Sequence, residues 1–306
     1  MSLTRLLTLA VICAPGFVCL AQTPSPLPAP PDRAAVKRMF DPWRPPVPPR
    51  HLLANIHYVG AVGVSSFLIT TPEGHVLLDT GFDDTVPLIQ RSVEQLGFKL
   101  TDIKFIVSSH AHIDHVGGHA RMKKLTGAKV IASAGDARAL ESGGEDDYIQ
   151  WPKDTITYTP VKVDRVVADG ERITLGGTTL TAHLTPGHTR GATTWTMEVN
   201  EGATVRHVVF FSSATINAGT RLLNNPLFPD FVEQFEATFA KLKALPCDIF
   251  FAPHGDQFGM AGKFVRLDRG EKENPFIDPA GWTRLIVAAE RAYRAQLSLE
   301  RSLIPH

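Results

Sequence analysis

Three histidines and one aspartate lie within six residues in the segment Ser109–His119, which reads SHAHIDHVGGH. His110 and His112 are two positions apart, so on an extended segment both rings point to the same side and can bind one ion. Asp114 and His115 are adjacent in the sequence, and they can converge on one place only on a sharp turn. The segment therefore predicts two metal positions side by side, built where a turn follows a strand.

Two more histidines follow apolar segments of the chain. His188 comes after a Pro-Gly turn in TPGHT, and His254 ends the stretch FFAPH. Rigid scaffolds place functional residues in loops at strand ends, so three separate strand ends are expected to deliver imidazoles to one site. The chain contains no HExxH motif, and no cysteine pair accompanies the histidines, which excludes the zincin and zinc-finger arrangements.

The apolar segments predict an α/β fold. Helical spacing is expected at 86–96, 117–125, 231–245 and 279–301. Strands are expected at 56–59, 65–70, 75–79, 105–107, 130–132, 161–167, 172–175, 179–185, 193–199, 205–212 and 249–252. Strands followed by helices, twice over, predict two sheets packed face to face with helices outside, a four-layer αββα sandwich. The whole of 51–306 is expected to form a single domain, a size that buries a sizeable core.

The beginning of the chain differs in composition from the rest. Residues 1–21 contain an apolar run and end in Ala21, which is typical of a secretory signal peptide and predicts a periplasmic or secreted protein. Cys19 leaves a lipoprotein anchor open as an alternative. Residues 22–50 are rich in proline and predict an extended arm lying on the body. Cys247 alone would then remain in the mature chain, so no intrachain disulfide is expected.

The charge balance excludes some partners. Lys plus Arg and Asp plus Glu both number 31, and no basic run occurs, so nothing points to nucleic acid. No segment is long and apolar enough to be read as a membrane span. A small-molecule substrate and a monomeric protein are the expectations.

The combination of HxHxDH, a PGH turn and a late strand-end histidine resembles the metallo-β-lactamase superfamily, from about Trp43 to the C-terminus. The resemblance implies that a first zinc ion is held by His110, His112 and His188, and a second by Asp114, His115 and His254. It also implies that Asp79, at the end of VLLDTG, braces the metal loop, a role that ligating groups require.

Within the superfamily the chain is most similar to the third β-lactamase subclass, B3. Thioesterases and lactonases of this superfamily carry a metal-bridging aspartate after a strand that here reads VVFFSSAT, and Ser213 stands in its place. Flanking segments such as GGEDD and DGERITLGG also resemble the subclass. One departure is His254-Gly255, because His-Pro is usual there and His-Gly is common among the thioesterases and lactonases.

The resemblance implies hydrolysis of the β-lactam amide by a metal-bound hydroxide, and hence antibiotic resistance. Asp114 would orient the nucleophile, and Ser213 and Thr215 would donate hydrogen bonds to the substrate carboxylate; alternatively these two hydroxyls only complete a turn. A lactonase or glyoxalase II-like thioesterase is the alternative enzyme, because fold alone does not select a chemistry. A zinc-binding protein with little turnover is the alternative from another class.

The remaining histidines show no pattern that predicts a site. Structural or surface roles are expected for His51, His57, His75, His183 and His207. A helix-surface position is expected for His119, and a place behind the metal ligands is its alternative. Cys247 is expected to be a small buried apolar residue rather than a metal ligand.

Overall fold

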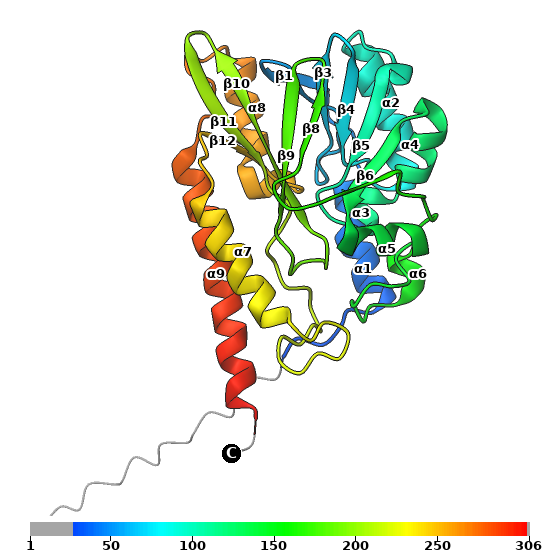
Figure 1. Ribbon diagram of the computed structural model, residues 1–306, viewed down its shortest axis with the longest axis vertical. Helices are drawn as coiled ribbons and strands as arrows, with labels where there is room; N and C mark the ends of the chain where they lie inside the picture. Colours follow the sequence, from blue (N-terminus) through cyan, green and yellow to red (C-terminus); the bar gives the residue numbers. More distant parts are fainter. Residues whose placement is uncertain (1–26, 305–306) are drawn as a thin grey trace, which may run out of the picture.

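The computed structural model describes residues 27–304, which form two β-sheets packed face to face with helices on both outer faces (Figure 1). The predicted αββα sandwich is confirmed. The seven-stranded sheet has the order β1-β2-β3-β4-β5-β6-β7, and the five-stranded sheet has the order β12-β11-β10-β9-β8.

The first sheet contains β1 (Arg50–Leu53), β2 (Ile56–Tyr58), β3 (Phe67–Thr71), β4 (Gly74–Leu78), β5 (Ile103–Val107), β6 (Lys129–Ser133) and β7 (Arg165–Val167). The second contains β8 (Arg172–Leu175), β9 (Thr178–Leu184), β10 (Thr193–Glu201), β11 (Thr204–Phe210) and β12 (Ile249–Phe251). In the first sheet β4 to β7 pair in parallel, and in the second β12 pairs in parallel with β11. Because β9 and β11 are both antiparallel to β10, the strands β9, β11 and β12 share one direction.

The helices are α1 (Arg33–Phe40), α2 (Val86–Gln95), α3 (Ile113–Val116), α4 (His119–Thr126), α5 (Ala134–Ser142), α6 (Lys153–Ile156), α7 (Phe231–Ala244), α8 (Met260–Asp268) and α9 (Pro279–Ser302). In Figure 1, α2, α4 and α5 cover the outer face of the first sheet, while α7 and α9 lie beside the second. No helix within residues 27–304 has the length and apolar character needed to cross a membrane.

The apolar core lies in two layers that share the first sheet. Val76 and Leu78 of β4 belong to the cluster between the two sheets, together with Trp195 and Phe210 of the second sheet. Leu77, between them, belongs to the cluster under the outer helices. The alternation follows the two-residue period of a strand, and both faces are buried because a layer covers each one.

The predicted extended arm is wrong for residues 33–40, which form the helix α1. Asp32 caps this helix through a 2.7 Å hydrogen bond from the Ala35 amide to its carboxylate. Val36 and Phe40 are buried one turn apart and pack with Phe82 of the body. The extended arm was predicted from the high proline content of residues 22–50, but the eight helical residues contain no proline.

Other differences are local. Helices α6 and α8 and strand β1 were not predicted, and the strand expected at 161–167 is confined to 165–167. The helix expected from 117 begins at His119, after the separate one-turn helix α3. The signal peptide and Cys19 lie outside the described residues.

Candidate metal centre

The predicted site residues all follow strands whose ends meet at one edge of the sandwich. Asp79 follows β4, and the HxHxDH segment follows β5. From the second sheet, His188 follows β9 and His254 follows β12. Since β4 and β5 are parallel, and β9 and β12 share one direction, the sheet topology itself gathers the four loops.

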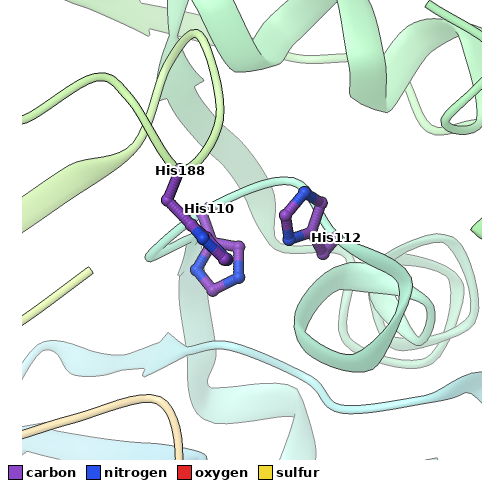
Figure 2. Close-up of side chains that lie close together, drawn as sticks. All are labelled: His110, His112 and His188. Atoms are coloured by element: carbon purple, nitrogen blue, oxygen red, sulfur yellow. The ribbon is translucent and has the colours of Figure 1, made fainter. Parts of the chain in front are cut away.

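His110, His112 and His188 form a first group. Their ligand atoms lie within 4.8 Å of one another. The ring centroids are 4.8 Å apart for His110 and His112, 4.5 Å for His110 and His188, and 4.6 Å for His112 and His188. Figure 2 shows the three rings converging from two loops. This is the arrangement that the predicted first metal site requires.

Asp114, His115 and His254 form a second group with the same 4.8 Å limit between ligand atoms. The Asp114 Oδ2 atom lies 3.0 Å from His115 Nε2 and 3.6 Å from His254 Nε2. The sharp turn that these adjacent residues need is α3, a single helical turn that starts after His112. The two groups are neighbours, because the His110 and His115 ring centroids are 4.2 Å apart.

Asp79 lies beneath both groups and is fully buried. Its carboxylate accepts hydrogen bonds from the Ser109 amide at 2.7 Å and the Ser109 hydroxyl at 2.6 Å. Its Oδ2 atom lies 3.4 Å from His115 Nδ1, and the Ser109 hydroxyl lies 3.1 Å from His110 Nδ1. Asp79 also has a φ of 59°, a left-handed conformation that these contacts hold in place. Asp79 therefore contacts Ser109 and His115 of the metal loop directly, and a bracing role for it stays a prediction.

Backbone carbonyls fix the orientation of two further imidazoles, those of His188 and His254. His188 Nδ1 lies 2.8 Å from the Thr215 carbonyl, and His254 Nδ1 lies 2.9 Å from the Gly63 carbonyl. Each carbonyl accepts the Nδ1 proton and so leaves the Nε2 lone pair facing the site.

Burial and like charges keep His110 and His188 of the first group neutral. The pKa of His110 falls well below its usual range because the ring is buried, with His115 and His188 adding to the effect. Burial and the neighbouring His112 lower the pKa of His188 to about 3. Neutral imidazoles offer the lone pairs that a metal ion needs. His115 differs: burial opposes its charge, but Asp114 and Asp79 raise its pKa to about 10.

The donor set fits two zinc ions. Imidazole and carboxylate are both established zinc ligands, and a set of five imidazoles to one carboxylate suits zinc better than calcium or magnesium. Both ring nitrogens of His115 and the Nε2 atom of His112 are buried without a well-formed hydrogen bond within residues 27–304. Unsatisfied buried nitrogens are costly unless something binds them, and a cation at Nε2 of His115 would satisfy that atom. The acidic groups that favour a proton on His115 would equally favour a cation there.

A pocket of about 250 Å³ opens over the two groups. Its apolar walls come from Trp43 and Phe40 of the N-terminal segment and from Trp151 and Ile149. Trp43 also packs on His254, with ring centroids 4.6 Å apart. The candidate metal ligands therefore lie at the bottom of the pocket and apolar, mostly aromatic side chains line its walls. Such a pocket suits a small molecule with apolar substituents.

The two predicted substrate-binding hydroxyls are placed differently. Thr215 lines the pocket, and its hydroxyl lies 3.1 Å from His188 Nδ1. Ser213 is buried behind it, with 3.2 Å between the two hydroxyl oxygens. Thr215 thus borders the pocket, and Ser213 lies behind it in contact with its hydroxyl.

The helix-surface position expected for His119 is wrong. The ring is fully buried, with Nδ1 2.7 Å from the Thr80 hydroxyl and Nε2 3.0 Å from the Ser108 hydroxyl. Burial, together with His115, lowers its pKa to about 3. His119 thus ties α4 to the ends of β4 and β5 beneath the metal loop. Helical spacing predicts which residues share a face of a helix. His119 was assigned to the exposed face of α4, and it lies on the buried one.

Sequence reasoning missed three residues of the segment 143–158 that support the first group. Asp147 lies beside His112, Tyr148 Oη donates to the Gly187 and His188 carbonyls, and Tyr158 Oη donates to the Ala111 carbonyl. In the sequence, GGEDD was noted only for its resemblance to subclass B3. Two acidic residues followed by a tyrosine could have indicated a supporting role, but the residues that Asp147 and Tyr148 contact are more than thirty positions away in the sequence.

Comparison with known proteins places the chain in a family. Residues 59–254 match the model of the metallo-beta-lactamase superfamily. The chain belongs to this superfamily, as its sandwich fold and its two ligand groups indicate.

Solved structures narrow the resemblance to subclass B3. The FEZ-1 metallo-beta-lactamase from Legionella gormanii has a TM-score of 0.82 and 38% identity, covering 84% of this chain and 97% of that one. BJP-1 from Bradyrhizobium japonicum, a subclass B3 enzyme, has a TM-score of 0.81 and 39% identity, covering 87% and 99%. A metallo-beta-lactamase from Cronobacter sakazakii has a TM-score of 0.81 and 41% identity, covering 86% and 99%.

Curated relatives point to another branch. The hydroxyacylglutathione hydrolase of Rhodospirillum rubrum is 28% identical over 165 residues, covering 53% of this chain and 51% of the relative. That of Hyphomonas neptunium is 32% identical over 108 residues, covering 35% and 34%. The chain thus spans about half or less of the length of these relatives. What the comparisons share is a metal-dependent hydrolase fold.

Proposed function

We propose that the chain is a dizinc β-lactamase of subclass B3 that hydrolyses the amide bond of the β-lactam ring. The observation that carries the proposal is a residue that follows β11. Thioesterases and lactonases of the superfamily have a metal-bridging aspartate there, and this chain has Ser213. Similarity at 38 to 41% identity over nearly the full length of solved metallo-beta-lactamases supports it. Partial matches near 30% support the alternative less well.

The six ligand residues divide the chemistry between them. His110, His112 and His188 would hold one zinc ion, and Asp114, His115 and His254 the other. Zinc supplies a hydroxide nucleophile near neutral pH and polarises a carbonyl. Asp114 is buried at the junction of the groups and stays ionised: although burial opposes it, His115 holds the pKa of Asp114 well below its usual range. Its ionised carboxylate is therefore available to accept a hydrogen bond that would orient the nucleophile.

Other residues would bind and shield the substrate. Thr215 lines the pocket, so its hydroxyl would donate a hydrogen bond to a substrate carboxylate, and Ser213, in contact with that hydroxyl, would orient it. Trp43 and Trp151 would cover the apolar substituents and limit access of bulk water. No nucleophilic serine of the GxSxG kind occurs in the sequence, so a covalent acyl-enzyme is not part of the proposal.

A hydroxyacylglutathione hydrolase is the second candidate, favoured by the curated relatives and by the His254-Gly255 pair. One panel separates the two. The zinc-loaded protein is assayed against nitrocefin, a carbapenem, an acyl-homoserine lactone and a glutathione thioester, with and without chelator. The proposal predicts that kcat/KM is highest for the β-lactams, is lost with chelator and returns with zinc. A preference for the thioester would overturn it.

The biological setting follows as a further part of the proposal. With the segment 1–21 acting as a signal peptide, the protein would act in the periplasm as a monomer and confer resistance to β-lactam antibiotics. Expression of the full chain in a susceptible Gram-negative host should raise the inhibitory concentration of a β-lactam, and deletion of residues 2–21 should abolish the increase.

A further inference from the structure

A buried carboxylate that belongs to neither ligand group lies against the first one. The Oδ2 atom of Asp147 is 3.3 Å from the Nε2 atom of His112, and the two side chains are 8% and 11% exposed. The Nε2 atom is buried and has no well-formed hydrogen bond to any other group within residues 27–304. Asp147 is thus the only acidic group within ion-pair distance of this nitrogen in that part of the chain.

The orientation of the His112 ring gives this contact its meaning. Figure 2 shows one ring nitrogen of His112 facing His110 and His188, while the other points away from them. The outward nitrogen is Nε2, the atom next to Asp147, so the inward one is Nδ1. A neutral imidazole carries its proton on one nitrogen and its lone pair on the other, and a carboxylate beside Nε2 favours the proton there.

The carboxylate of Asp147 is itself held in place. Its Oδ1 atom accepts a 3.1 Å hydrogen bond from the Ile149 amide. The adjacent Tyr148 donates through Oη to the carbonyls of Gly187 at 2.8 Å and His188 at 2.7 Å. One short segment therefore contacts both loops that supply the first group.

We propose that Asp147 is a positioning residue that holds His112 with its proton on Nε2 and its lone pair on Nδ1, directed at the metal of the first group. It contacts neither substrate nor metal and acts through His112. Partners of this kind fix the tautomer and ring orientation of ligating histidines, and their loss weakens metal binding. The inference rests on the metal centre of the proposed function but is independent of which substrate the centre hydrolyses.

The neighbouring Asp146 provides a matched control. It is one residue away, carries the same charge and is far more exposed, with its carboxylate 3.1 Å from Arg138 Nε at the surface. A loss of general charge near the loop would affect both positions, whereas a contact with His112 involves only Asp147.

The test measures zinc and cobalt affinity by competition with a chromophoric chelator, so it needs no substrate. Asp147→Ala should weaken one of the two sites by about 10- to 100-fold and leave the other within about twofold. Asp147→Asn keeps a neutral acceptor and should weaken the same site by less, about 3- to 10-fold. Asp146→Ala should change neither. The visible spectrum of the cobalt-loaded Asp147 variants should shift, because the His112 ligand is less well oriented.

A double-mutant cycle separates positioning from damage to the loop. In a His112→Ala background, Asp147→Ala should cost no further affinity, because its effect passes through the missing ring. If Asp147→Ala does not fold, Asp147→Asn carries the same cycle. Unchanged affinity at both sites in folded Asp147 variants, or an equal loss with and without His112, would overturn the proposal. Because affinity is measured directly, this result stands apart from any failure to open β-lactams.

Discussion

The rings of His110 and His188 meet with their centroids 4.5 Å apart, although one follows β5 of the first sheet and the other follows β9 of the second. The first ligand group is therefore assembled only when the two sheets pack against each other. The second group has the same property, because His254 follows β12 while Asp114 and His115 follow β5. Folding of the sandwich and formation of the metal centre are consequently linked, and bound metal should stabilise the fold.

Removal of one histidine from each group should separate the two metal sites. His188→Ala should deplete mainly the metal of the first group, and His254→Ala mainly that of the second, each lowering zinc from about two to about one per chain. Zinc is measured by mass spectrometry after dialysis against metal-free buffer. His183→Ala is the control. His183 lies on β9, belongs to neither ligand group and contacts the Thr196 hydroxyl, so this variant should keep both ions. Unchanged occupancy in both variants would contradict the assignment of ligands.

A side chain at Gly187 should destabilise the protein, because this glycine forms the turn that presents His188. Its φ is 140°, and a Cβ there would lie 3.0 Å from the ring of Phe235. Gly187→Ala should cost about 1 to 3 kcal/mol of unfolding free energy and reduce zinc at the first group. Gly177→Ala is the control for backbone strain alone, since its φ is 82° with no atom within 4 Å of the added Cβ. Urea unfolding and zinc content are measured together, and an equal loss of zinc in both variants would contradict a role for the turn at His188.

Glu300 should anchor the loop that borders the site. The carboxylate is buried on α9 and accepts hydrogen bonds from the amides of Leu222 and Leu223 at 2.8 to 2.9 Å. Glu300→Ala leaves these donors unpaired and should cost about 1.5 to 3 kcal/mol, measured by chemical denaturation. Glu290→Ala, on the same helix but paired with the exposed cations Lys243 and Arg294 rather than with backbone amides, should cost less than about 1 kcal/mol. Equal losses at the two positions would contradict the account of the loop.

Stability should fall in mildly acidic solution, partly through His57. Burial, with the nearby charges of His51 and His75, lowers the pKa of His57 from 6.5 to about 4. The unfolded chain then binds a proton more readily than the folded one, so the contribution to stability is complete above pH 6.5 and is lost as the pH falls towards 4. The melting temperature of the protein should therefore decline more steeply over this range than that of His57→Leu. Parallel curves for the two proteins would contradict the prediction.

Local patterns predicted the ligands better than their supports. His110, His112, Asp114 and His115 are close in the sequence and follow a recognisable strand, so their convergence could be inferred from spacing. The contact between Asp147 and His112 joins a loop to a strand end thirty-five residues earlier, and no periodicity encodes it. The same limit explains His119, since its buried partners Thr80 and Ser108 come from other elements.

The helix α1 was missed for a different reason. Its sequence is helical by composition, but proline-rich flanks on both sides outweighed eight proline-free residues. Only its packing shows why it forms there. The ring centroids of Phe40 and Phe82 are 5.2 Å apart, and Phe40 and Trp43 together line one side of the pocket. A segment whose structure depends on docking against the body carries little signal of its own.

Anomalous diffraction at the zinc edge, on crystals of the protein as purified, tests the central claim most directly. We predict two zinc peaks per chain, one bonded to His110, His112 and His188 at about 2.0 to 2.1 Å, and one bonded to Asp114, His115 and His254 at about 2.0 to 2.2 Å. The absence of zinc from both groups, or a zinc ion bound elsewhere while His188 and His254 point away from the cluster, would contradict the account.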